Sequence, residues 1–313
     1  MKILVKPGKS KNILATITIG GEYYHFWYKN AFPSWEKYCI RHGLGLVVFN
    51  KDLISDKDKL WKKATWQKML IAETLRNSSL SVKNVCYLDT DILINYKSPN
   101  IFDDYKSDTI GLVSIVKNMP FSIDESRRKI SFLRHTYYDE KYPLDSAIFK
   151  TIDQLYSYHN LPVQENFACM GLIVFNVNNH SDLMLHWFNK YDKNVQSITD
   201  GGDQTHYNYE MLNWGNITWL DYKYQAIWTY EMAIKYPFLY SYGRNKKNLI
   251  RECIEASLMT NYFLHFAGSW LESEMWKLGG VFESKKKKRE IECYYNYLDM
   301  FVTGESKGKI NPS

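Results

Sequence analysis

The chain has 313 residues, of which 45% are hydrophobic, and it carries a net charge of +6. This length supports one large domain, or a domain with an appended subdomain. The mild positive charge suits an anionic ligand, but it does not by itself indicate nucleic-acid binding. Aromatic residues make up 16% of the chain, more than a core needs, which fits a sugar-binding cleft as well as many other surfaces.

The cysteines are scattered along the chain and form no C-x-x-C pair. They are Cys39, Cys86, Cys169, Cys253 and Cys293. In a chain of this size the pattern indicates reduced thiols and a cytoplasmic protein. No N-terminal hydrophobic segment follows Met1, and no apolar run reaches the roughly 18 residues that a membrane span requires. A secreted or Golgi-anchored protein would need such a segment.

The first part of the chain alternates between strand and helix patterns. The expected strands are 13–19, 44–50 and 82–94, and the expected helices are 22–42, with a break near Pro33, and 61–77. The first strand is a β-branched run that ends at a glycine pair. Strands and helices that alternate at this spacing are typical of βαβ units with a parallel sheet.

The second part continues the pattern with strands expected at 108–116 and 167–177 and helices at 181–191 and 203–214. Residues 117–160, rich in tyrosine and charge without a clear period, are expected to form an insertion or lid beside the site. We expect one domain over 1–278 and a basic, helical C-terminal tail over 279–313, which contains the run Lys285–Arg289. That run is expected to be a solvated surface feature, and contact with an anionic membrane surface is the alternative.

Two aspartates, Asp89 and Asp91, interrupt the apolar strand CYLDTDILI. Strand side chains alternate between faces, so both carboxylates are expected on the same face. Two ionised carboxylates this close repel each other unless a cation lies between them or they share a proton. The chain holds its own control, because Asp56 and Asp58 repeat the D-x-D spacing in a polar, lysine-rich loop and are expected to be merely solvated. The alternative for Asp89 and Asp91 is a strand-edge pair that meets loop donors.

Three further residues or pairs are candidates for the same site. Lys68 lies within the apolar stripe of helix 61–77, where its amine either snorkels out to solvent or reaches phosphates or the carboxylate pair. His265, followed by Gly268, is either a hydrogen-bonded core histidine or a ligand beside a tight turn. Asp203 and Gln204 open a helix after a glycine pair, so Asp203 is either a functional carboxylate or a simple N-cap.

In this order, the motifs resemble those of nucleotide-sugar glycosyltransferases with the GT-A fold, most closely the glycogenin-like and bacterial galactosyltransferase members of family GT8, with some similarity to GT34. The resemblance covers about residues 13–278 and rests on the stretches ILATITIGGEYY, YLDTD, MGLIVFN, DQTHYN and HFAG. It implies a GT-A (Rossmann-like) α/β fold with a mixed, mostly parallel central sheet. It also implies transfer of a hexose or pentose from a nucleotide-sugar, expected to be a UDP-sugar, to a glycan, lipid-linked or protein acceptor with retention.

The resemblance assigns roles to individual residues. It implies that Mn²⁺ or Mg²⁺ is bound by Asp89, Asp91 and His265, a mixed carboxylate and imidazole set that suits Mn²⁺. The implied contacts of the nucleotide and its phosphates are Ile17, Thr18, Tyr23, Tyr24, Lys68, Asp89 and Gly268. Asp203 and Gln204 are implied to lie beside the donor sugar as the catalytic pair.

The chain departs from the family pattern after Gly268 and at Cys169. The lysine of the usual Lys-Pro-Trp is missing, with the next lysine at Lys277, and Cys169-Met170-Gly171 replaces the frequent Asn-x-Gly. Two other functions are kept open. One is a phosphatase of the haloacid-dehalogenase type, although Leu93 does not fit its motif. The other is a carbohydrate-binding protein without catalysis.

Overall fold

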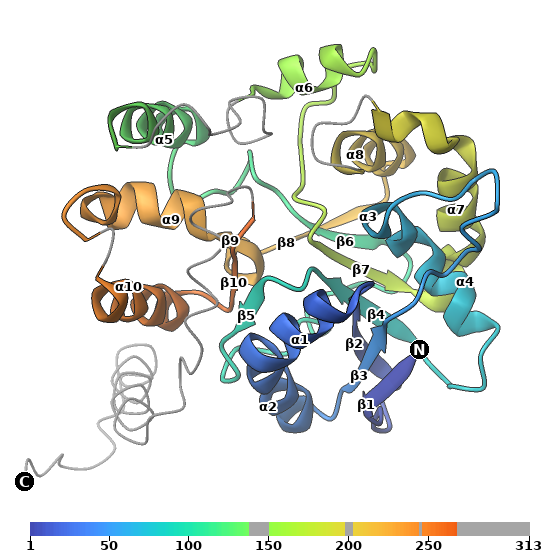
Figure 1. Cartoon of the computed structure of the whole chain (residues 1–313). Helices are drawn as coiled ribbons and strands as arrows, with labels where there is room; N and C mark the ends of the chain where they lie inside the picture. The colour runs from blue at the N-terminus through green and yellow to red at the C-terminus, as the bar shows by residue number, and fades with distance from the viewer. Residues whose placement is uncertain (138–149, 198–202, 244–245, 268–313) are drawn as a thin grey trace, which may run out of the picture.

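The computed structural model describes residues 1–137, 150–197, 203–243 and 246–267 (Figure 1). A seven-stranded sheet forms its centre. A three-stranded sheet lies beside it, next to the ends of strands of the large sheet. Helices cover both faces of the large sheet. The elements that carry the candidate residues meet where the two sheets adjoin.

The large sheet is mixed and mostly parallel. Its order is β1 (Lys2–Val5), β3 (Gly45–Phe49), β2 (Asn12–Ile17), β4 (Asn84–Leu88), β7 (Leu172–Asn176), β6 (Ile110–Val113) and β8 (Ile217–Leu220). Strands β2, β3, β4, β6 and β8 run in one direction, whereas β1 and β7 run in the other. The expected α/β class, with a mixed, mostly parallel central sheet flanked by helices, is confirmed.

The central strands are mostly apolar, as expected for a sheet with both faces buried. Along β2, Leu14 packs into one core cluster, while Ile13 and Ala15 pack into the other. The first cluster lies against helices α1 (Gly21–Asn30) and α2 (Phe32–His42). The second cluster lies against α3 (Ala64–Gln67), η1 (Lys68–Leu70), α4 (Ile71–Arg76), α7 (Val177–Lys190) and α8 (Gln204–Trp214).

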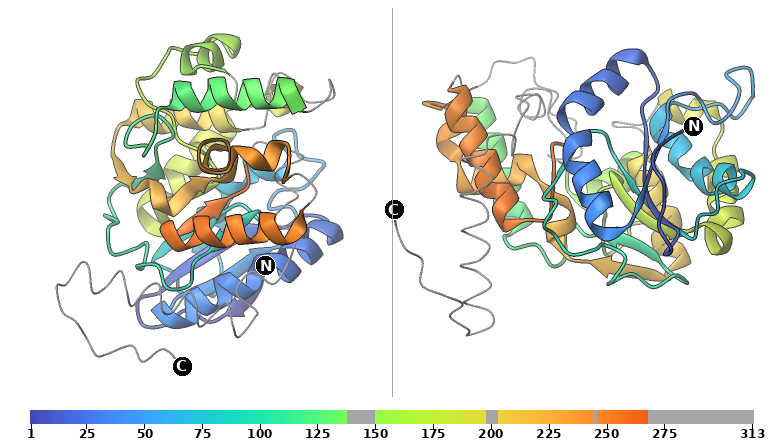
Figure 2. Two further views of the ribbon diagram at one scale, coloured as in Figure 1. Left: turned by 90° about the vertical axis from the view of Figure 1, so that its left-hand side faces the viewer. Right: turned by 90° about the horizontal axis from the view of Figure 1, so that it is seen from below.

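The small sheet contains β5 (Ile92–Ile94), β10 (Phe263–His265) and β9 (Ala226–Ile227) in that order. Strand β10 pairs antiparallel with β5 and parallel with β9. The remaining elements are α5 (Ile123–Tyr137), α6 (Ile152–Tyr158), η2 (Lys193–Ser197), η3 (Tyr222–Gln225), α9 (Trp228–Lys235), η4 (Pro237–Tyr240) and α10 (Lys247–Thr260). Figure 2 shows α9 and α10 on the side of the small sheet that faces away from the large one.

The expectation of one continuous strand over 82–94 is wrong. Strand β4 ends at Leu88 and β5 begins at Ile92, and the two strands belong to different sheets. Asp89 and Asp91 therefore lie in the turn that carries the chain from one sheet to the other, not on one face of a strand. Because the residues on both sides of this turn are apolar, the periodicity of the sequence does not show that the chain changes sheet here.

Other expected elements are shorter or divided in the structure. The helix expected over 61–77 is the succession α3, η1 and α4, and the expected insertion over 117–160 contains α5 and α6, with 138–149 outside the described residues. The tail over 279–313 lies entirely outside them, so its expected helix and the surface role of its basic run stay predictions. Within the described part of the chain, no helix has both the length and the apolar character needed to cross a membrane.

Candidate metal and donor site

The side chains of Asp89, Asp91 and His265 converge at the junction of the two sheets. One ligand atom from each lies within 4.8 Å of the others. The Nε2 atom of His265 is 3.2 Å from Oδ1 of Asp91 and 3.9 Å from Oδ2 of Asp89. His265 is buried, whereas both carboxylates are partly exposed. A buried imidazole and two accessible carboxylates can thus face one ion from the protein side.

Backbone pairing explains why His265 meets the aspartates. In the small sheet His265 is opposite Ile92, the residue after Asp91, and the Phe266 N–H donates to the Asp91 carbonyl at 3.1 Å. On the other side, the Asp89 N–H donates to the Gly171 carbonyl at 2.8 Å. These hydrogen bonds hold the turn between β10 and the chain segment that leads into β7.

Asp89 uses its two carboxylate oxygens for different partners. Its Oδ1 accepts a 2.7 Å hydrogen bond from the Tyr87 hydroxyl and is 3.9 Å from the Lys68 Nζ. Its Oδ2 faces His265. The protein therefore satisfies one oxygen itself and turns the other toward the place where a cation would bind.

Asp91 and His265 are paired at 3.2 Å, and the contact is an ion pair whenever the imidazole is protonated. Partial loss of water contact would by itself raise the pKa of Asp91, but the adjacent His265 lowers it below its ordinary value. Burial alone would lower the pKa of His265, yet Cys169 and Asp91 raise it well above the usual range. A metal ion that binds Nε2 must replace the proton that this pairing stabilises.

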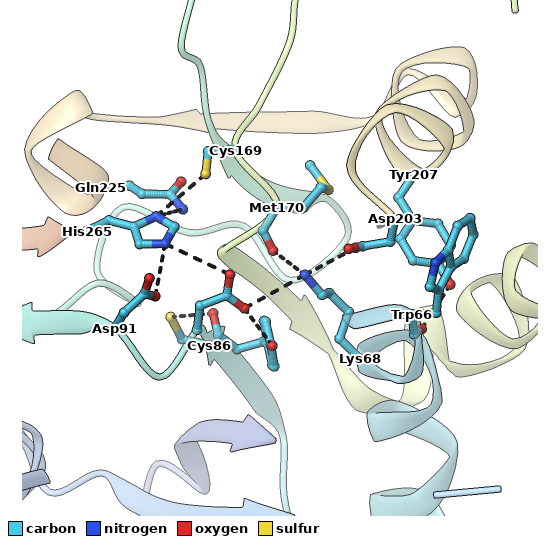
Figure 3. A network of polar contacts seen from close by, with 12 residues as sticks. Trp66, Lys68, Cys86, Asp91, Cys169, Met170, Asp203, Tyr207, Gln225 and His265 are labelled. Carbon is cyan, nitrogen blue, oxygen red and sulfur yellow. Dashed lines mark hydrogen bonds and ion pairs between the residues drawn. The ribbon is translucent and has the colours of Figure 1, made fainter. Parts of the chain in front are cut away.

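Lys68 does not snorkel to solvent, so the structure rejects that alternative. Its Nζ is buried, lies 3.1 Å from Oδ2 of Asp203 and donates to the Met170 carbonyl at 2.7 Å (Figure 3). Burial lowers the pKa of Lys68, but the carboxylates of Asp203 and Asp89 outweigh it, and the net pKa is raised. Lys68 is thus a buried cation between Asp203 and a candidate metal ligand.

Asp203 is not a simple N-cap. It precedes α8, but its side chain makes no capping hydrogen bond, and it is buried against Lys68. Burial raises the pKa of Asp203 to about 6, against the lowering effect of Lys68. Gln204, the first residue of α8, is partly buried beside it.

The asparagine of DQTHYN has a role in the scaffold. The buried side chain of Asn208 accepts from the Ala168 N–H at 2.7 Å and donates to the Ala168 carbonyl at 2.8 Å. This two-point contact ties α8 to the segment that carries Cys169, Met170 and Gly171. Sequence reasoning named the motif but did not foresee this contact.

The residues expected around the nucleotide lie at the end of β2 and at the start of α1. Ile17 and Thr18 are buried, and the Thr18 hydroxyl has no hydrogen-bond partner among the described residues. Tyr23 is 66% exposed, whereas Tyr24 is half-buried and stacks on Tyr28. Gly268 lies outside the described residues, so its expected contact stays a prediction.

Asp56 and Asp58 are exposed in the loop before α3, as expected for the D-x-D of a polar loop.

Three residues of the site were not assigned to it from the sequence. Tyr87 is the hydroxyl donor to Asp89, Gly171 packs against Asp89 and His265, and Gln225 contacts the imidazole from behind. Tyr87 had a signal in the sequence because it stands two residues before Asp89, and Gly171 had one because it belongs to the MGLIVFN stretch, whereas Gln225 had none.

No protein-family model matches the chain, and no curated protein sequence is significantly similar to it. Several glycosyltransferases are among the solved structures to which the chain is similar. One is a glycosyltransferase involved in the glycosylation of the major capsid of PBCV-1, with 11% identity, 85% of this chain and 98% of that chain covered, and a TM-score of 0.48. Another is the galactosyltransferase LgtC in complex with donor and acceptor sugar analogs, with 12% identity, coverage of 90% and 99%, and a TM-score of 0.46. A third is mouse xyloside xylosyltransferase 1, with 12% identity, coverage of 82% and 98%, and a TM-score of 0.38.

Proposed function

We propose that the protein is a metal-dependent glycosyltransferase that moves a hexose or pentose from a nucleotide-sugar to a hydroxyl group. The proposed donor is a UDP-sugar, and the proposed acceptor is a glycan, a lipid-linked sugar or a protein. The observation that carries this proposal is the convergence of Asp89, Asp91 and His265 at the junction of the two sheets. Two carboxylates and an imidazole are a suitable donor set for Mn²⁺, with Mg²⁺ as the alternative. When bound, the ion would hold the donor diphosphate and neutralise charge on the leaving group.

The chain's own charges suit an anionic donor beside this site. Lys68 is a buried ammonium whose Nζ lies 3.1 Å from Asp203 and 3.9 Å from Asp89. We infer that this lysine helps to fix Asp89 and adds positive potential near the diphosphate, because a cation in a buried site interacts more strongly than one in water. The ends of β2 and α1, with Ile17, Thr18, Tyr23 and Tyr24, together with Gly268, are proposed to contact the nucleotide.

Asp203 and Gln204 are proposed to act beside the donor sugar. Retention is the proposed outcome, with the leaving phosphate taking the acceptor proton. Asp203 is the alternative acceptor of that proton, as inversion would require a positioned carboxylate base. NMR of the first product formed from an α-linked donor tests this point: an α-linked product supports retention, and a β-linked product overturns it.

The metal proposal is tested by binding and transfer in the same set of variants. A panel of nucleotide-sugars is screened for Mn²⁺-dependent thermal stabilisation, since a ligand at 100 times its Kd adds about 2.7 kcal/mol. Asp91→Ala and His265→Ala are expected to remain folded and to lose both Mn²⁺-dependent donor binding and transfer. Asp56→Ala, which changes the exposed D-x-D, is the matched control and should behave as the parent. Full transfer by chelator-treated parent, or normal activity of Asp91→Ala, would refute the proposal.

The same samples separate the two alternative functions. A phosphatase of the haloacid-dehalogenase type would release phosphate from a generic phosphoester without sugar transfer. A carbohydrate-binding protein without catalysis would bind sugar but would not hydrolyse or transfer the donor sugar, even slowly.

A further inference from the structure

The imidazole of His265 has two sides with different neighbours. Its Nε2 faces Asp91 and Asp89 and is the atom that can bind a metal. Its Nδ1 faces away from the carboxylates, 3.2 Å from the side-chain amide of Gln225 and 3.5 Å from the Sγ of Cys169 (Figure 3). All three side chains are buried, so no bulk water competes for Nδ1.

The valence of the ring decides what Nδ1 must do when Nε2 binds an ion. A metal takes the Nε2 lone pair, so the neutral ring carries its only proton on Nδ1. A buried N–H without an acceptor is costly, and ligating histidines usually donate this second N–H to an oxygen acceptor. The site therefore needs an acceptor behind His265, which Gln225 and Cys169 are placed to supply.

Gln225 has an acceptor to offer. It is fully buried at the end of η3, one residue before β9, and β9 pairs with the strand of His265. Its Nε2 is the atom nearest to Nδ1, while its Oε1 is buried and accepts no hydrogen bond among the described residues. A half-turn of the amide exchanges these two atoms and directs Oε1 at the Nδ1–H.

We propose that Gln225 is the positioning residue of the metal site and that its Oε1 accepts the Nδ1–H of His265, which holds Nε2 unprotonated and directed at the ion. This inference rests on the proposed metal-dependent function. An amide is suited to the task, because it can donate to Nδ1 when Nε2 carries the proton and can accept from Nδ1 when Nε2 binds metal. Cys169 is the weaker partner, because sulfur is a poor acceptor.

The test compares Gln225→Met and Gln225→Glu. Methionine keeps the length of the side chain and removes the acceptor, whereas glutamate keeps an acceptor. With Mn²⁺ as the probe, alone and with UDP, Gln225→Met should bind the ion about 10- to 100-fold more weakly than the parent. Gln225→Glu should bind it at least as tightly as the parent. If Gln225 only filled space, the buried charge of glutamate would make it the more damaging replacement, which gives the opposite order.

Cys169→Ala separates the amide from the thiol, and we expect it to bind Mn²⁺ nearly as well as the parent does. A spectroscopic readout comes from ¹⁵N-histidine NMR with Zn²⁺ as a diamagnetic probe. One histidine, absent from the spectrum of His265→Asn, should carry its proton on Nδ1. Thermal unfolding without metal checks that each variant is folded.

The outcomes distinguish this inference from the proposal on which it rests. A parent that binds neither Mn²⁺ nor Zn²⁺, with or without UDP, overturns both. A parent that binds while folded Gln225→Met binds equally well overturns the role of Gln225 alone. A large loss in Cys169→Ala with none in Gln225→Met, or a proton on Nε2 in the Zn²⁺ complex, does the same.

Discussion

Gly171 provides a direct test of how tightly the metal ligands are packed. A Cβ added at this position would lie 2.2 Å from Cε1 of His265 and 2.9 Å from Oδ2 of Asp89. Ordinary contact begins at 3.4 Å, so the imidazole would have to move by about 1.2 Å. Metal–ligand distances tolerate only about 0.2 Å, so this displacement removes a ligand. We expect Gly171→Ala to weaken Mn²⁺ binding by about 100-fold or more. The free energy of unfolding should fall by about 1–3 kcal/mol.

The assay for this variant measures free Mn²⁺ by electron paramagnetic resonance, alongside denaturant unfolding of the metal-free protein. Gly21→Ala is the matched control, because a Cβ at Gly21 meets nothing within 4 Å and its Mn²⁺ affinity should not change. The expected signature is a large loss of metal affinity with a small loss of stability. Parent-like Mn²⁺ affinity in folded Gly171→Ala would refute the geometry described for the site.

Lys68→Met should lower the free energy of unfolding by about 3–5 kcal/mol, because it leaves Asp203 buried without its cation. Denaturant unfolding should show most of this loss returned in the double variant Lys68→Met with Asp203→Asn, and no return would contradict the pairing. The pKa of Asp203 is about 6, so its carboxylate is charged above that pH and neutral below it. The transfer rate should therefore fall as the pH drops below 6, whereas Asp203→Asn should be slow at every pH. Asn208→Ala should lower the free energy of unfolding by about 2–4 kcal/mol, because it leaves the buried N–H and carbonyl of Ala168 without their side-chain partner. An unchanged free energy of unfolding would exclude that contact. Binding to anionic liposomes should weaken when the five charges of Lys285–Arg289 are removed if the run contacts membranes, and unchanged binding would dismiss that role.

The alternation of strands and helices could be predicted for the large sheet because its strands are long apolar runs between clear breaks. Strand β2 and the two helices after it are recognisable from β-branched residues, the glycine pair and Pro33. The small sheet could not be predicted in the same way. Its strands contain only three, three and two residues, so each is too short to show a period, and pairing across the chain determines them.

The convergence of Asp89, Asp91 and His265 was predicted from the sequence, but for a partly wrong reason. Asp89 and Asp91 were expected to share the face of one strand, whereas the turn between two sheets brings them together. His265 could be added only through the family resemblance, because nothing in its local sequence points to residues so distant. Gln225 is unpredictable on the same grounds, since its partner becomes a neighbour only when β9 pairs with β10.

The position of β10 has a consequence for the order in which the site is made. The turn with Asp91 leaves the ribosome roughly 170 residues before His265, a delay of roughly 9–35 s at about 5–20 residues per second. During that interval the nascent chain holds both carboxylates but not His265, and Ile92–Ile94 has no partner strand. If the site binds metal as proposed, full affinity for the ion would arise only after β10 has paired with β5. Metal occupancy would then mark a chain whose synthesis has passed β10 and whose small sheet has formed.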